Sequence, residues 1–128
     1  MTKNVLKIIS DAMDALNIEY DFVRYNKHPI PETYFVGEYT ETASMTEDGL
    51  QEATFMLTGF SRAKSWLTLV NAKEQIEQYF NRVYGKTVMM ADGSAACVFY
   101  NNALIVPTGD AELKSVQINL FVKEWRVN

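Results

Sequence analysis

The stretch LQEATFMLTGFS, residues 50–61, alternates between two kinds of side chain along its length. Phe55 and Leu57 alternate with Thr54 and Thr58. Successive side chains of a β-strand point to opposite faces of the sheet, so this period of two predicts a long strand with one buried face. Residues 34–41 form a second β-like run. We expect the two runs to pair as a hairpin.

The connection between these two runs is long and acidic. TASMTEDG, residues 42–49, exceeds the two to five residues of a tight hairpin loop, so we expect a loop that projects beyond the sheet. Between Pro29 and Ser61 the chain has several acids and no Lys or Arg. Five of these acids are candidate contact residues: Glu38, Glu41, Glu47, Asp48 and Glu52.

The acidic arm has three interpretations. The segment TEDGLQE lacks the D-x-[DN]-x-[DN]-G spacing of a calcium loop, so a calcium site has little support. A solvated hairpin whose charges prevent edge-to-edge aggregation is a sufficient explanation. The third interpretation is an interaction arm whose acids face basic residues of a neighbouring copy. Candidates for that basic surface are Arg62, Lys64, Lys73 and Arg82.

Helix-like and strand-like patterns flank the hairpin. Apolar residues recur at helical spacing over residues 5–16 and from about Ser65, a candidate N-cap, to Arg82. A short strand-like run follows the first helix. The β-rich remainder contains an Asp92–Gly93 turn, a further run after Asn101–Asn102, and an alternating run over residues 115–125. We therefore predict one α+β domain over residues 1–128, an antiparallel β-sheet with two helices packed on one face, in the order αβββαβββ.

Composition narrows the functional classes. The chain has 128 residues, 48% of them hydrophobic, and a net charge of -4, so it lacks the basic field that draws proteins to nucleic acid. No stretch approaches the roughly 18 apolar residues of a membrane span, and the N-terminus lacks a signal-peptide pattern. Cys97, the single cysteine, lies in an apolar run typical of a buried thiol.

Motifs for chemistry are missing from the sequence. One histidine and one cysteine cannot form a clustered metal site, and the six scattered glycines form no phosphate-binding loop. His28 and Asp21 are the nearest acid–base candidates, but a histidine before Pro29 in a polar loop is more often solvated. We expect no enzymatic activity, no catalytic residue, no metal and no cofactor.

Two alternatives stay open. The first is a small-molecule-binding or enzymatic α+β domain, in which aromatic residues such as Tyr20, Phe55, Phe99 and Phe121 line a pocket. Aromatic residues at alternating strand positions are more often part of the core. The second is an accessory protein that binds one partner as a monomer, which has no distinct sequence signature.

The order of elements resembles a known family. An N-terminal amphipathic helix, a strand, a proline-containing entry to TYFVGEYTE, a long polar loop, the strand EATFMLTGFSR, a second helix, and the segments IVPTGD and VQINLFVKEW follow one another. This string resembles the tail-terminator and head-tail joining (tail-completion) proteins of long-tailed bacteriophages and prophages. The resemblance covers nearly the whole chain and rests on length, element order and local character.

The resemblance implies a non-enzymatic virion structural protein. Its copies, typically six, would form a ring at the head-proximal end of the tail and contact tail-tube and head-connector proteins. The protein would reside in the host cytoplasm before assembly. DNA would pass through the ring without specific binding, and the acidic arm would be a subunit contact or face the lumen. The residues do not distinguish a terminator from a connector.

Overall fold

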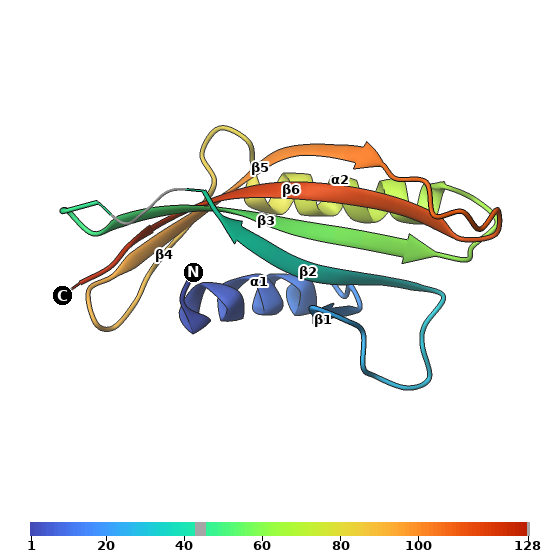
Figure 1. Cartoon of the computed structure of the whole chain (residues 1–128), viewed down its shortest axis with the longest axis horizontal. Coiled ribbons are helices and arrows are strands. Elements are labelled where there is room, and N and C mark those ends of the chain that lie inside the picture. Colours follow the sequence, from blue (N-terminus) through green and yellow to red (C-terminus); the bar gives the residue numbers. More distant parts are fainter. Residues whose placement is uncertain (43–45, 128) are drawn as a thin grey trace.

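The structure, a computed structural model, describes residues 1–42 and 46–127. Residues 43–45 of the expected projecting loop lie outside the described residues. The elements follow the order α1 (Lys3–Ala15), β1 (Tyr20–Phe22), β2 (Thr33–Glu41), β3 (Leu50–Ser61), α2 (Leu67–Phe80), β4 (Lys86–Met89), β5 (Ala95–Ile105) and β6 (Lys114–Trp125). Figure 1 shows this arrangement, which confirms the predicted α+β class and element order.

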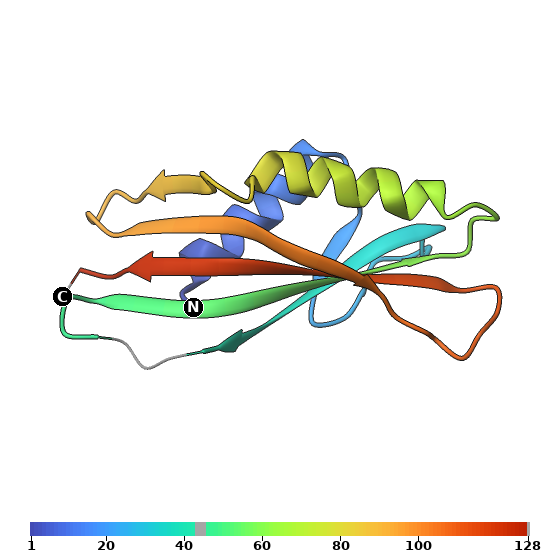
Figure 2. The same ribbon diagram turned by 90° about the horizontal axis from the view of Figure 1, so that it is seen from above.

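The strands form one twisted six-stranded sheet in the order β1-β2-β3-β6-β5-β4 (Figure 2). Its centre is the long antiparallel pair of β3 and β6, which are in register from Leu50 opposite Trp125 to Ser61 opposite Lys114. The prediction of a wholly antiparallel sheet is wrong at one edge, because β1 pairs with β2 in parallel. The loop of residues 23–32 carries the chain back along the sheet before β2 begins, so both strands run in the same direction.

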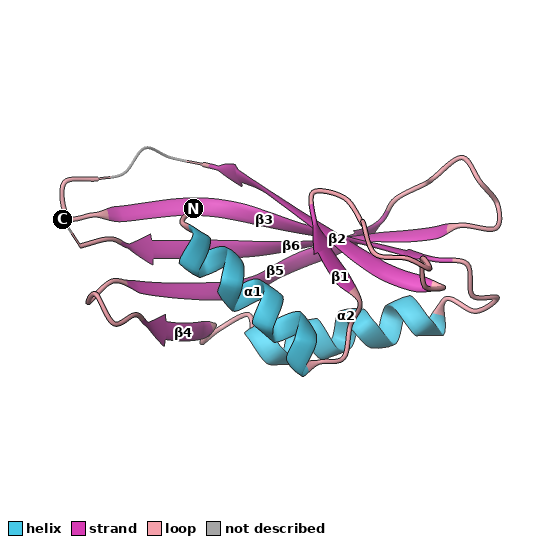
Figure 3. Cartoon of the chain, turned by 90° about the horizontal axis from the view of Figure 1, so that it is seen from below, coloured by secondary structure: helices cyan, strands magenta, loops and turns pink. Residues whose placement is uncertain are grey.

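Both helices cover the same face of the sheet, as predicted (Figure 3). One hydrophobic cluster joins α1, α2 and the inward-facing positions of β3 and β6. Its fully buried members include Ile9, Ile76, Phe55, Leu57 and Leu120. The alternation in residues 50–61 is confirmed, because the odd-numbered positions from Gln51 to Ser61 are buried and the even-numbered positions are partly exposed.

Two glycines allow aromatic rings to lie flat against the sheet on this covered face. A Cβ at Gly37 would lie 2.5 Å from the ring of Phe55, and one at Gly59 would lie 2.5 Å from the ring of Phe35. Real Cβ atoms do not approach other atoms this closely, so both positions require glycine for the rings to keep their places.

Local details differ from the sequence-based expectation at two places. Helix α2 begins at Leu67, and the Oγ of Ser65 accepts a hydrogen bond from the Leu67 N–H at 3.1 Å, so Ser65 still satisfies a free donor at this helix start. Asn101 and Asn102 lie inside β5, where the register shifts between Tyr100 and Asn102. A β-bulge explains the turn-like composition there.

Candidate interaction surface

The second face of the sheet, which we call the open face, has no helix over it in the described residues (Figure 2). Its side chains mix aromatic, aliphatic, polar and, nearer the hairpin tip, charged types. The partly exposed uncharged ones include Tyr34, Val36, Thr54, Met56, Thr58, Phe60, Phe99, Gln117, Asn119 and Phe121. The polar groups bond to one another: Gln117 donates to Asn119 at 3.0 Å, and Asn119 donates to Asn102 at 2.7 Å. Such a mixed surface is typical of protein–protein interfaces.

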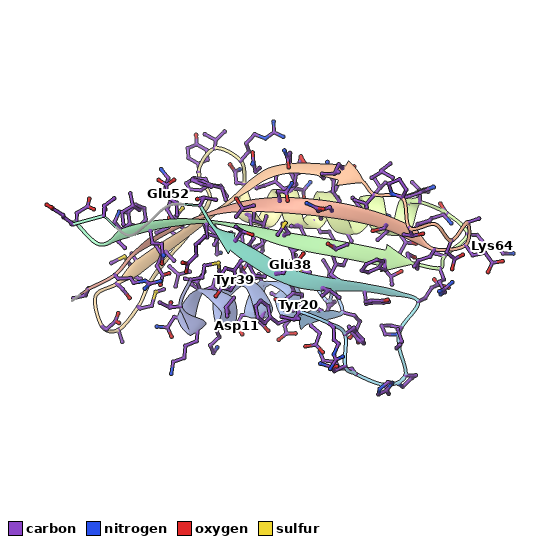
Figure 4. All side chains as sticks on the ribbon, in the orientation of Figure 1. Asp11, Tyr20, Glu38, Tyr39, Glu52 and Lys64 are labelled. Atoms are coloured by element: carbon purple, nitrogen blue, oxygen red, sulfur yellow. The ribbon has the colours of Figure 1, made fainter. Side chains whose placement is uncertain are left out.

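The five candidate acids lie on three different parts of the molecule. Glu38 and Glu52 belong to the open face, because they stand opposite Met56 and Lys123 in register. Figure 4 labels both side chains. Glu41 stands opposite the buried Ala53, so it points to the helix-covered side. Glu47 and Asp48 are exposed near the tip of the hairpin.

Residues near both ends of the chain offset the negative charge of the acids at the hairpin base. The Met1 amino group contacts a Glu41 carboxylate oxygen at 2.5 Å, and this hydrogen bond and its charge lower the pKa of Glu41. Buried Glu124 accepts a hydrogen bond from the Thr2 hydroxyl at 2.5 Å and lies 3.7 Å from the Arg126 guanidinium. Sequence reasoning missed this compensation because the partners are distant along the chain.

The tip of the hairpin is an ordered turn where the structure describes it. The Asp48 carboxylate accepts hydrogen bonds from the Thr46 hydroxyl and, at 3.4 Å, from the Leu50 N–H. These bonds to the charged form lower the pKa of Asp48. Gly49 follows with a φ of +85°, a conformation that favours glycine. Glu47 makes no ion pair within residues 1–42 and 46–127.

The four candidate basic residues form two groups and not one surface. Arg62 and Lys64 follow β3, at the end of the sheet away from the hairpin tip, where Figure 4 labels Lys64. Arg62 forms an exposed ion pair with Asp110 at 3.3 Å. Lys73 and Arg82 instead lie beside β5, with their charged groups 5.6 and 5.7 Å from the centre of the Tyr100 ring. Lys73 also pairs with Glu77 at 3.1 Å.

The two acid–base candidates lie at the loop after β1, and Asp21 stabilises this loop. The two carboxylate oxygens of Asp21 accept hydrogen bonds from the N–H groups of Phe22 and Asn26, each at 2.9 Å. His28 is exposed in the same loop, and no hydrogen bond links it to Asp21 in the described part of the chain. The described residues contain no cluster of three potential metal ligands.

The four aromatic residues considered for a pocket are divided between the two faces. Tyr20 and Phe55 are buried in the core, and burial, with the nearby Asp21 carboxylate adding to it, raises the pKa of Tyr20 to about 12. Phe99 and Phe121 stand opposite each other on the open face. The buried Cys97 thiol donates to the Tyr84 carbonyl at 3.8 Å. The sheet therefore separates the rings and does not gather them around one cavity.

A shallow apolar groove lies where α2 meets β5. It has a volume of about 240 Å³, and the ammonium of Lys73 is its only charged group among the described residues. The groove is lined by Trp66, Leu69, Val70, Lys73, Ala103, Leu104, Ile105 and Val116. Trp66 and Val70, two apolar residues of the predicted second helix, are 40% and 42% exposed. They are exposed because β5 is the last strand over this part of α2.

No family model matches the chain, and no curated protein is similar to it in sequence. Neither helix in the described residues is long and apolar enough to cross a membrane.

Proposed function

We propose that the protein is a non-enzymatic structural component of a bacteriophage or prophage virion, a tail-terminator or head-tail joining protein whose copies form a ring. The observation that carries this proposal is an exposed acidic tip on an elongated sheet. Glu47 and Asp48 lie near the hairpin tip, and neither forms an ion pair within the described residues. At the opposite end of β3, Arg62 is paired with Asp110 and Lys64 is exposed. A twelve-residue strand spans about 40 Å, so the acidic tip and Lys64 are far apart on one copy.

The open face supports an assembly role over a pocket-based one. In the described residues, one sheet face of mixed aromatic and polar character is partly exposed over β2, β3 and β6, whereas the groove has an apolar lining and one ammonium. Different patches on a single chain that complement each other associate head to tail, and such contacts close into a ring when the rotation between copies permits. Ring partners would be further copies, the tail tube and the head connector.

The acidic tip then lies at a subunit contact or faces the lumen of the ring. A negatively charged lumen repels the phosphate backbone, so DNA passes without binding. Gold labelling of a Glu47→Cys variant in an assembled ring, on a Cys97→Ser background, locates the tip. Label at the outer rim would rule out the lumen position.

The proposal is tested by negative-stain imaging of the purified protein at high concentration. We expect closed rings of uniform size with a central hole. Fields of single copies at every concentration, or open fibres, would contradict a ring-forming component. A Glu47→Lys/Asp48→Lys variant imaged beside an Asp14→Lys variant separates the effect of the acidic tip from that of charge reversal elsewhere.

A further inference from the structure

Each outer strand of the sheet leaves half of its neighbour's edge unpaired in the described residues. On one side β1 pairs only with Phe35–Gly37, so the outer edge of β2 is free over residues 38–41. On the other side β4 pairs only with Ala95–Val98, so the outer edge of β5 is free over residues 101–105. A free edge presents unpaired N–H and C=O groups that pair readily with another strand.

The outward backbone groups on both free edges can be identified. Phe35 donates its N–H to the Glu19 carbonyl, and the Gly37 carbonyl accepts from Val23, each at 2.8 Å, so the odd-numbered residues of β2 face outward. Tyr39 and Glu41 continue that series. On β5, Val106 donates to Ser115 of β6, so the alternation leaves Ala103 and Ile105 facing outward.

We propose that the free edge of β2 in one copy, residues 38–41, adds as an antiparallel strand to the free edge of β5 in the next copy, residues 101–105. The inference rests on the ring assembly proposed above and names its contact. Within the sheet, β2 runs antiparallel to β5. Two copies placed side by side in the same orientation therefore bring these two strands together as an antiparallel pair. In this pairing Tyr39 lies opposite Ile105, and Glu41 lies opposite Ala103. The outward N–H and C=O groups of these residues then form hydrogen bonds across the contact. Thr40 lies opposite Leu104.

The side chains beside the two edges complement each other. Tyr39, 36% exposed and stacked on Phe22, points to the helix-covered side and meets the apolar groove next to Ile105 in this arrangement. The backbone groups and the apolar surface therefore favour the same partner, a second copy of the chain.

The positions of the free edges favour a closed assembly. The β2 edge is free at the level of Asn119 to Val122 of β6, and the β5 edge is free at the level of Val116 to Asn119. Each added copy is therefore shifted along the strand direction. A closed barrel of tilted strands requires such a stagger between neighbours.

The backbone part of the contact is tested by an Ile105→Pro variant with Ile105→Ala as its matched control. Ile105 is 67% exposed and its N–H faces outward, so proline there removes an edge donor without removing a bond to β6. Sedimentation should show Ile105→Pro as a folded monomer at concentrations where wild type and Ile105→Ala assemble. Assembly of Ile105→Pro equal to that of Ile105→Ala would contradict the contact.

A second test does not depend on the proline variant folding. Leu104 and Thr40 lie on opposite edges of one copy, so a Thr40→Cys/Leu104→Cys variant cannot close a disulfide within itself. Under mild oxidation it should give a ladder of cross-linked oligomers that neither single variant gives. A Thr54→Cys/Leu104→Cys variant, with its first cysteine on central β3, is the control and should give no ladder. If wild type forms rings but the Thr40→Cys/Leu104→Cys variant gives no ladder, this contact alone is overturned. If wild type forms no oligomer, the ring proposal is overturned as well.

Discussion

The two faces of the central strands β3 and β6 differ in what they contact. Phe55 and Leu120 are fully buried under the helices, whereas their sequence neighbours Met56 and Asn119 are partly exposed on the open face. The covered face stabilises the fold through burial and close packing. The open face and the free edges add little to that core and are free to contact other copies. We therefore expect substitutions on the covered face to change stability, and substitutions on the open face and free edges to change the proposed assembly.

The largest expected effect is on the covered face. Leu120→Asp places an unpaired carboxylate in the core at a cost of several kcal/mol, which is most of the stability of an ordinary domain. We expect loss of the folded state by circular dichroism, and the same for Ile9→Asp. The matched control is Asn119→Asp, on the other face of the same strand, which should leave the protein folded. Equal effects of Leu120→Asp and Asn119→Asp would remove the distinction between the faces.

A smaller loss is expected where the strand backbone meets a ring. Gly59→Ala forces the Phe35 ring to move, and overpacking of this kind costs about 1–3 kcal/mol in urea denaturation. In a Phe35→Leu background the same substitution should cost less, because the contacting ring atoms are absent. An equal cost in both backgrounds would mean that Phe35 is not the obstacle.

The buried phenol of Tyr20 gives the covered face a pH dependence. Its pKa is raised to about 12, so the folded state holds the phenol proton where the unfolded chain, at about 10, releases it. This contribution is present below pH 10 and is lost as the pH rises towards 12. Denaturation at several alkaline pH values should show a steeper loss for wild type than for Tyr20→Phe. Parallel curves would mean that Tyr20 keeps an ordinary pKa.

The smallest effect on stability is expected at the hairpin tip. Glu47→Lys changes an exposed charge without an ion pair in the described residues, so the free energy of unfolding should change by less than about 0.5 kcal/mol. Self-association should nevertheless weaken, whereas Asp14→Lys, on the exposed side of α1, should leave it unchanged. A large drop in melting temperature for Glu47→Lys would place this residue in a structural network.

The sequence predicted the covered face well because its signal is local. The period-two pattern in residues 50–61 and the helical spacing of residues 5–16 both depend on near neighbours. The parallel direction of β1 was not predicted, since the same alternation fits either direction and the path of residues 23–32 decides it. The partners of Glu41 and Glu124 were missed for a related reason: Met1 lies 40 residues from Glu41, and Thr2 lies 122 residues from Glu124.

The candidate surface was only partly predictable. The acids near the hairpin tip were identified from composition, whereas the division of the basic residues into two groups depends on how β3 and α2 are placed in space. The free edges of β2 and β5 depend on the short lengths of β1, which ends at Phe22, and of β4, which begins at Lys86. Strand ends are set by turns and tertiary pairing more than by local propensity.

Sedimentation velocity across a wide concentration series distinguishes a closed head-to-tail ring from a monomer and from an open polymer. We expect monomer to convert into one larger species of fixed size, because a ring stops growing when it closes. A monomer at all concentrations, or a series of species that grows without limit, would contradict it.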